Sequence, residues 1–126
     1  MAVAQTGFVS LDCSDAQPLA DFWAAMLGGE VAFTTAKGTI CVRTDWVWLA
    51  MIEIADYRPP TWPENSVPKQ MHLDLAVDDL PAAAAQAQEL GATPAVMQPA
   101  PELRRIMFDP AGHPFCLTTQ IPAAAR

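Results

Sequence analysis

The sequence is poor in positive charge and in cysteine, and it contains no long hydrophobic run. Seven Lys and Arg residues stand against fourteen Asp and Glu residues, which gives a net charge of −7. Nucleic-acid binding needs clustered basic side chains, and only Arg104 and Arg105 are adjacent, so we exclude that class. No apolar run approaches the roughly 18 residues of a membrane span, and the first residues lack the basic and apolar regions of a signal peptide. The acidic balance favours cationic ligands over anionic membranes.

The three cysteines, Cys13, Cys41 and Cys116, are too widely spaced for a disulfide scaffold or a CxxC zinc site. Each lies in an apolar stretch, which is typical of reduced, buried thiols. We therefore expect a cytoplasmic protein. With 52% hydrophobic residues, the chain has enough apolar side chains to bury a core, and its length suits a single domain over residues 1–126.

The sequence contains an internal repeat of one structural unit. Alternating apolar residues from Phe8 run into Asp15 at a helix start, and the same pattern runs from His72 to Asp79. Each predicted strand is followed by an amphipathic helix that ends at Gly28 or Gly91. Three further strands follow each helix, and they are predicted over residues 30–35, 39–44 and 47–54, and over residues 93–98, 103–109 and 114–119.

The repeat predicts an α+β fold built from two βαβββ modules. Module 1 covers about residues 6–57, and module 2 covers about residues 70–120. Residues 58–69 contain four prolines and are predicted to form a stiff linker. One module alone buries little surface, so we expect the two to pair through their first strands into a curved sheet that encloses a cleft. Such a cleft is the default ligand site.

Several short motifs add to this pattern. They are Leu27-Gly28, the stretch Pro59–Pro63, Gln70–Leu75 running into Val77–Leu80, and Asp109–Phe115. With these motifs the chain resembles the vicinal oxygen chelate superfamily from about Thr6 to Gln120, and within it the compact glyoxalase-like subgroup. That superfamily includes glyoxalase I, extradiol dioxygenases, and fosfomycin- and bleomycin-resistance proteins. The resemblance implies the glyoxalase/bleomycin-resistance fold and a homodimer, but it does not select one function, because the fold serves lyases, dioxygenases and non-catalytic binders.

The resemblance also implies where a metal would lie. Metal enzymes of this superfamily place a ligand at the start of each module's first strand and a carboxylate on each module's last strand. His72 matches the position in module 2, whereas Phe8 stands at the equivalent position in module 1 and cannot ligate. Cys116 stands where module 2 usually has Glu, and Glu53 ends the last strand of module 1. The chain therefore either lacks the full metal site or holds Zn, Fe, Mn or Ni through His72, Glu53 and Cys116.

Strand alternation predicts which side chains face the cleft. Phe8, Asp12, Asp74 and Cys116 fall on the face away from the helices. For Cys116 the favoured interpretation is a small buried side chain.

Aromatic side chains offer a second kind of site. Trp46 and Trp48 are two residues apart and would share one strand face as a platform for an aromatic or cationic ligand. Core packing explains the pair as well. Trp62 in the proline-rich segment would either cover the cleft or anchor the segment.

Three hypotheses for a small-molecule function follow. In the first, the protein binds an amphipathic aromatic ligand without metal, between Trp platforms and acids such as Asp12 and Asp74. In the second, it is a metal-dependent lyase or dioxygenase that uses His72 with Glu53 and Cys116. In the third, it is a metal-free enzyme in which His72, positioned by Asp74, acts as general base.

Overall fold

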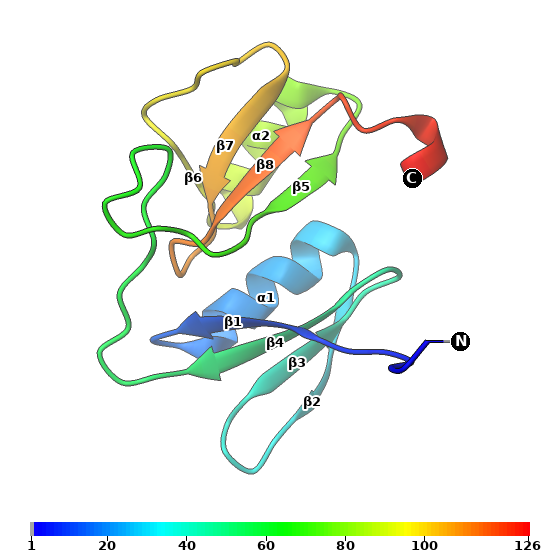
Figure 1. Cartoon of the computed structure of the whole chain (residues 1–126), viewed down its shortest axis with the longest axis vertical. Coiled ribbons are helices and arrows are strands. Elements are labelled where there is room, and N and C mark those ends of the chain that lie inside the picture. Colours follow the sequence, from blue (N-terminus) through cyan, green and yellow to red (C-terminus); the bar gives the residue numbers. More distant parts are fainter. Residues whose placement is uncertain (1) are drawn as a thin grey trace. The chain divides into compact units, whose positions relative to one another are not determined.

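The computed structural model describes residues 2–126 and shows an α+β fold of two βαβββ modules (Figure 1). This confirms the fold predicted from the sequence repeat. The described chain divides into two compact units, one ending at Tyr57 and one beginning at Arg58. Module 1 contains β1 (Val9–Cys13), α1 (Ala16–Leu27), β2 (Glu30–Thr34), β3 (Ile40–Arg43) and β4 (Trp48–Glu53). Module 2 contains β5 (Leu73–Ala76), α2 (Leu80–Leu90), β6 (Thr93–Pro94), β7 (Arg104–Phe108), β8 (Pro114–Thr118) and a terminal 3₁₀ turn, Ala123–Ala125.

The sheet of module 1 has the strand order β1-β4-β3-β2. β1 pairs with β4 in parallel, and the other two pairs are antiparallel. One face of this sheet carries Val42, Leu49 and Met51, which are fully buried, and α1 packs on β3 and β4. The apolar stripe of α1 supplies Leu19, Phe22 and Trp23 to the same core, whose burial accounts for most of the favourable free energy of the module.

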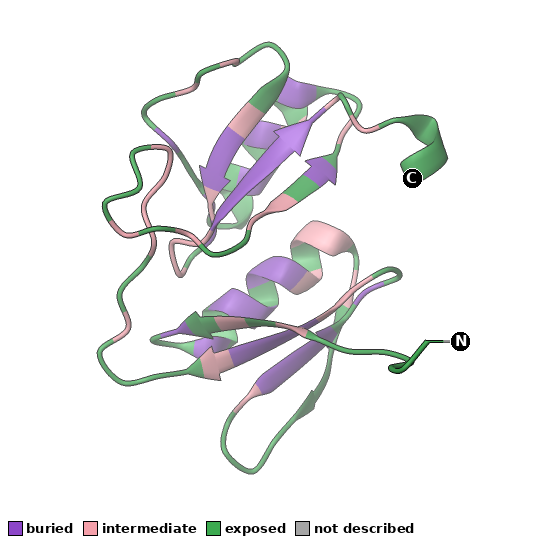
Figure 2. Ribbon diagram, viewed as in Figure 1, coloured by how far each residue is buried: buried purple, intermediate pink, exposed green. Residues whose placement is uncertain are grey.

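The sheet of module 2 has the equivalent order, β5-β8-β7-β6. β5 pairs with β8 in parallel, with Asp74 opposite Cys116. All five residues of β8 are buried, and Figure 2 shows the buried residues concentrated in the central strands and on the inner faces of the helices. The stripe of α2 is thinner than that of α1, with Leu80, Ala84 and Ala87 buried.

The strand predicted over residues 93–98 is much shorter than expected, because it ends at Pro94. Beyond it, the amide N–H of Ala95 still donates to the carbonyl of Ile106 at 3.0 Å. The Gln98 side chain forms hydrogen bonds in place of backbone pairing. Its Nε2 donates to the Ala95 and Ile106 carbonyls, and its Oε1 accepts from the Ile106 amide at 2.8 Å. The Gln98 side chain thus supplies the hydrogen bonds to the backbone of β7 that a longer β6 strand would have made.

The proline-rich segment is folded and belongs to the second compact unit. A β-bridge joins Thr61 to Pro68, and the Thr61 amide donates to the Val67 carbonyl at 2.7 Å. The Val67 amide donates in turn to the Thr61 hydroxyl. These bonds close a loop that brings Trp62 onto the sheet of module 2. Among the described residues, no helix is both long and apolar enough to span a membrane.

Candidate functional site

Each sheet has one face on its helix and a second face that the helix does not cover. We call the second face the open face. On module 1 it carries Phe8, Asp12, Phe33, Arg43 and Trp48, which follows from the strand registers and the alternation of side chains. On module 2 it carries His72, Asp74, Arg104, Ile106 and Cys116.

Three potential ligand groups meet on the open face of module 2. His72 Nε2 lies 3.2 Å from Asp74 Oδ1, and one ligand atom each from His72, Asp74 and Cys116 lies within 4.8 Å of the others. The parallel pairing of β5 with β8 produces this arrangement, because it places Asp74 directly beside Cys116, while His72 is two residues before Asp74 on the same face. The predicted catalytic pair, His72 and Asp74, is therefore in contact.

The Cys116 thiol is buried, with 1% of the residue exposed. Burial is the largest cause that raises the pKa of Cys116 to about 11, and the Asp74 carboxylate contributes to the same rise by its charge and by accepting the thiol hydrogen bond. The positive charges of Arg104 and Lys69 act in the opposite direction. In the absence of a cation, Cys116 is thus a neutral thiol that donates to Asp74.

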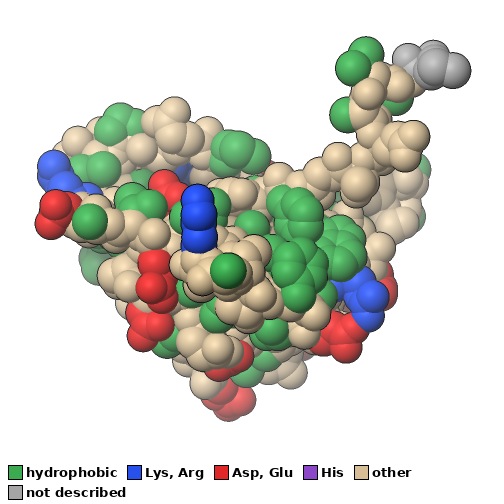
Figure 3. All heavy atoms as spheres, turned by 90° about the horizontal axis from the view of Figure 1, so that it is seen from below, with side chains coloured by type: hydrophobic (Ala, Val, Ile, Leu, Met, Phe, Trp, Pro, Cys, Tyr) green, Lys and Arg blue, Asp and Glu red, His purple; other side chains and the backbone are tan. Residues whose placement is uncertain are grey.

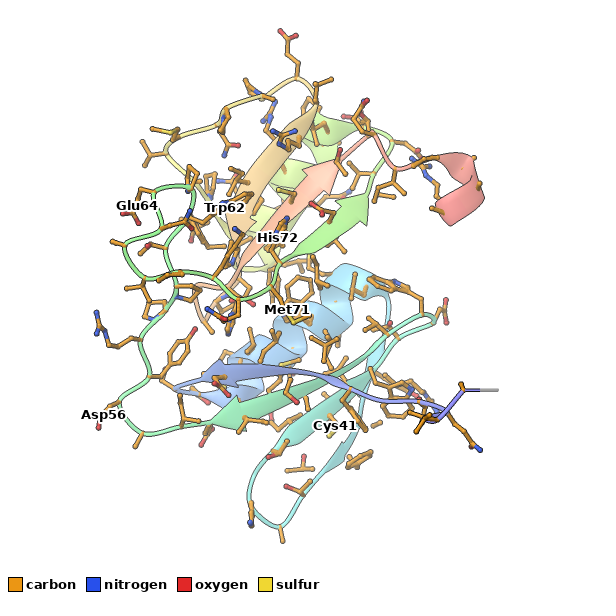
Figure 4. All side chains as sticks on the ribbon, viewed as in Figure 1. Cys41, Asp56, Trp62, Glu64, Met71 and His72 are labelled. Carbon is orange, nitrogen blue, oxygen red and sulfur yellow. The ribbon has the colours of Figure 1, made fainter. Side chains whose placement is uncertain are left out.

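Trp62 covers part of this group. Its ring stacks on the His72 ring with centroids 4.9 Å apart and an interplanar angle of 29°, and Figure 4 shows the two labelled side chains beside each other. Trp62 also packs, with Phe108, against the buried cluster of Ala95, Ile106 and Cys116. The Lys69 ammonium lies 4.2 Å from the Trp62 ring centroid, in a cation–π contact.

On module 1 the open face carries a cluster of three aromatic rings, which we call the aromatic face: Phe8, Phe33 and Trp48. The ring centroids of Phe8 and Trp48 are 5.5 Å apart, and Phe33 lies 6.4 Å from each of them. Phe8 and Phe33 remain 48% and 47% exposed. Arg43 lies over Trp48 at 5.9 Å and forms an ion pair with Glu30. Figure 3 shows a group of hydrophobic side chains with a basic and an acidic side chain next to it.

The structure corrects the expected tryptophan platform. Trp46 lies in the turn before β4 rather than in the strand, where the Thr44 hydroxyl accepts from its backbone amide, and its side chain is strongly exposed. Trp46 and Trp48 therefore do not share a strand face, and Phe8 and Phe33 are the rings that meet Trp48. Phe33 was missed because the signal for it, an aromatic residue on a strand paired to β3, depends on register across a bulge between Val31 and Phe33.

Glu53 contacts the start of α1, whereas Asp12 lies on the exposed side of β1. Glu53 Oε2 accepts from the backbone amide of Ala16 at 2.9 Å, so this carboxylate caps the start of α1. Asp12 lies on the exposed side of β1, opposite Ile52 in the sheet register. A separate open hollow of about 250 Å³ lies where α1 ends, lined by residues that include Gly28, Glu30 and Arg43, and it holds none of the predicted site residues.

Comparison with known proteins agrees with the two-module fold. The model of a family described as "Glyoxalase-like domain" matches residues 8–118. No curated protein matches the sequence.

Several solved structures share the fold. The fosfomycin resistance protein FosX from Mesorhizobium loti has a TM-score of 0.71 at 11% identity, over 98% of this chain and 97% of that one. A FosX mutant from Listeria monocytogenes, solved with Mn(II) and dihydroxypropylphosphonic acid, has a TM-score of 0.70 at 12% identity, over 96% and 93%. A glyoxalase family protein from Enterococcus faecalis has a TM-score of 0.65 at 19% identity, over 94% and 99%.

Proposed function

Because the chain belongs to the glyoxalase-like domain family, of the vicinal oxygen chelate superfamily, we propose that it binds a small aromatic molecule on the aromatic face. The observation that carries this proposal is the clustering of Phe8, Phe33 and Trp48 on a sheet face that α1 does not cover. Exposed aromatic clusters of this kind mark binding surfaces more often than isolated apolar residues do.

The arrangement of the rings supports a flat ligand. Phe8 meets Phe33 and Trp48 edge to face, at 85° and 71°, so the cluster presents both ring edges and ring faces to a planar guest. Cys41 and Ala50, small residues paired in the sheet register, lie on the same face. The Asp12 carboxylate lies on the same face of the sheet, and its negative charge would favour a cationic ligand.

Fluorescence titration tests this proposal. Neutral, cationic and anionic aromatic compounds are titrated against the intrinsic tryptophan emission of the wild-type chain. We expect saturable quenching, and we expect Trp48→Ala to weaken binding at least about tenfold, since a buried aromatic contact at a binding site is worth 1–2 kcal/mol or more. Trp46→Ala is the matched control: it removes an exposed tryptophan from the neighbouring turn and should leave the affinity unchanged.

Two results would contradict the proposal. One is an equal loss of affinity in both tryptophan variants. The other is the absence of saturable binding for every compound in the panel. A loss of preference for cationic compounds in Asp12→Asn would assign the charge selection to that carboxylate.

A metal-dependent lyase or dioxygenase is the second candidate, favoured by the grouping of His72, Asp74 and Cys116. The Listeria FosX structure contains Mn(II), so the fold accommodates a divalent cation. In this class of enzyme a bound cation polarises neighbouring substrate oxygens. Here His72 would supply a nitrogen ligand, and the Asp74 carboxylate lies 3.2 Å from that nitrogen. Without a cation, the same pair would serve as a general base with its positioning carboxylate.

Metal analysis separates the two candidates. The chain is incubated with Zn, Fe, Mn or Ni, desalted, and its bound metal is quantified, with His72→Ala as the comparison. One equivalent that is lost in His72→Ala supports the metal-dependent candidate, whereas a chain without metal under all four conditions rejects it. The aromatic-ligand titration is interpreted separately, because its variant, Trp48→Ala, changes a residue of module 1, whereas His72→Ala changes a residue of module 2.

A further inference from the structure

We propose that module 2 alone holds a thiophilic divalent cation, Zn(II), through His72 Nε2, a carboxylate oxygen of Asp74 and the sulfur of Cys116. This inference rests on the second candidate function and makes it more specific. It replaces Glu53 by Asp74 as the carboxylate ligand, and it selects a class of metal different from the Mn(II) in the Listeria FosX structure.

The geometry is close to that of a zinc site. Zn–S bonds of about 2.3 Å and Zn–N and Zn–O bonds of about 2.0–2.2 Å place two ligands of one tetrahedral cation about 3.5 Å apart. The His72–Asp74 distance of 3.2 Å already fits, and no pair of the three ligand atoms exceeds 4.8 Å. A contraction of roughly 1 Å, within reach of side-chain rotation, therefore completes the set.

The chemistry of the three ligands selects the metal. Thiolate sulfur is a soft ligand that favours Zn over Mn, which prefers oxygen. With the thiol deprotonated by the cation, Asp74 and Cys116 contribute two negative charges and neutral His72 none, so the charges balance those of Zn(II). Glu53 is not part of this ligand set, because its carboxylate already accepts a hydrogen bond from the Ala16 amide at the start of α1.

Solvent access fits a cation with an open position. The Asp74 and His72 side chains are 55% and 27% exposed, whereas Cys116 is buried beneath Trp62 and Phe108. One side of the group is thus closed by aromatic rings, and the other is open to water. Three protein ligands with a free fourth position are the arrangement of catalytic zinc sites.

Cobalt substitution tests the inference without an assay of activity. The chelator-treated wild-type chain is titrated with Co(II), and thiolate coordination is detected as a charge-transfer absorption in the near ultraviolet. Zn(II) and Mn(II) then compete for the site. We expect one equivalent of Co(II) and its displacement by equimolar Zn(II) but not by equimolar Mn(II). We also expect partial quenching of the tryptophan emission, because Trp62 is stacked on His72.

Variants assign the ligands. Cys116→Ser and Cys116→Ala should each abolish the absorption, and Asp74→Asn should weaken Co(II) binding at least about tenfold. Cys41→Ser removes a buried thiol from module 1 and should leave the Co(II) absorption and affinity unchanged. Glu53→Gln should also retain the metal. Circular dichroism confirms that each variant is folded before its binding is interpreted.

The outcomes distinguish failure of this inference from failure of the metal-dependent function. Metal that binds without the thiolate absorption, or that prefers Mn(II), or that depends on Glu53 rather than Asp74, overturns the zinc site and leaves the metal-dependent candidate standing. A folded chain that binds neither Co(II) nor Zn(II) nor Mn(II) overturns both.

Discussion

At the scale of single residues, the environment of Cys116 decides how the open face of module 2 behaves. The residue is buried, it donates to Asp74, and its pKa is raised to about 11. The unperturbed thiol would instead titrate near 9.0. The same neighbours that make a thiol unreactive in the free protein would hold a thiolate once a cation supplies two positive charges. One set of side chains can therefore serve as a neutral hydrogen-bonded group or as a ligand set.

The raised pKa of Cys116 predicts a loss of stability in alkali. Between pH 9 and 11 the unfolded chain releases a proton that the folded chain retains, so the free energy of unfolding falls as the pH rises. We expect the urea midpoint of the metal-free protein to decrease over this range more steeply in the wild type than in Cys116→Ala. Parallel pH profiles for the two proteins would show that the thiol titrates as freely in the folded state as in the unfolded state.

At the scale of elements, the two helices begin in different ways. Asp79 caps α2, because its Oδ1 accepts from the Ala82 amide at 3.0 Å. Asp15 occupies the same position before α1 but makes no such bond. There, Glu53 at the end of β4 supplies the missing acceptor to Ala16. This contact joins the start of the helix to the sheet beneath it.

The helix caps give a prediction on stability. Glu53→Ala should lower the free energy of unfolding by about 1 kcal/mol, and Asp79→Ala by a similar amount, since each removes a cap acceptor. Asp15→Ala should be close to neutral, and Glu53→Gln should recover part of the loss through its amide oxygen. Urea denaturation of the four variants measures these differences. If Asp15→Ala costs as much as Glu53→Ala, Asp15 is the effective cap.

The same contrast shows what the sequence could and could not predict. Short-range patterns predicted both modules and the helix ends at Gly28 and Gly91, and strand alternation predicted that His72 and Asp74 share a face. Contacts across strands were less accessible: the meeting of Asp74 with Cys116 depends on the parallel register of β5 and β8, and Phe33 reaches Trp48 only after a bulge. Glu53 was predicted as a metal ligand because the superfamily places a carboxylate on this strand, and its position in the sequence did not reveal its contact with the start of α1.

At the scale of the whole molecule, two copies of one fold carry different chemistry. The open face of module 1 gathers three aromatic rings, whereas that of module 2 gathers a histidine, a carboxylate and a thiol. Phe8 and His72 hold corresponding positions in the repeat, and Ser10 with Ala50 in module 1 corresponds to Asp74 with Cys116 in module 2. The shared backbone supplies the platform, and the side chains of each open face determine what it binds.

The assembly of the chain is a prediction that concerns the molecule as a whole. We expect a homodimer, as the resemblance to the superfamily implies, and the exposure of large apolar side chains such as Val96 and Met97 is consistent with a further contact surface. Light scattering coupled to size-exclusion chromatography should then give twice the chain mass of 13.6 kDa, falling on dilution if the association is weak. A mass of one chain at every concentration tested would mean that each copy functions alone, with its open faces formed without a partner subunit.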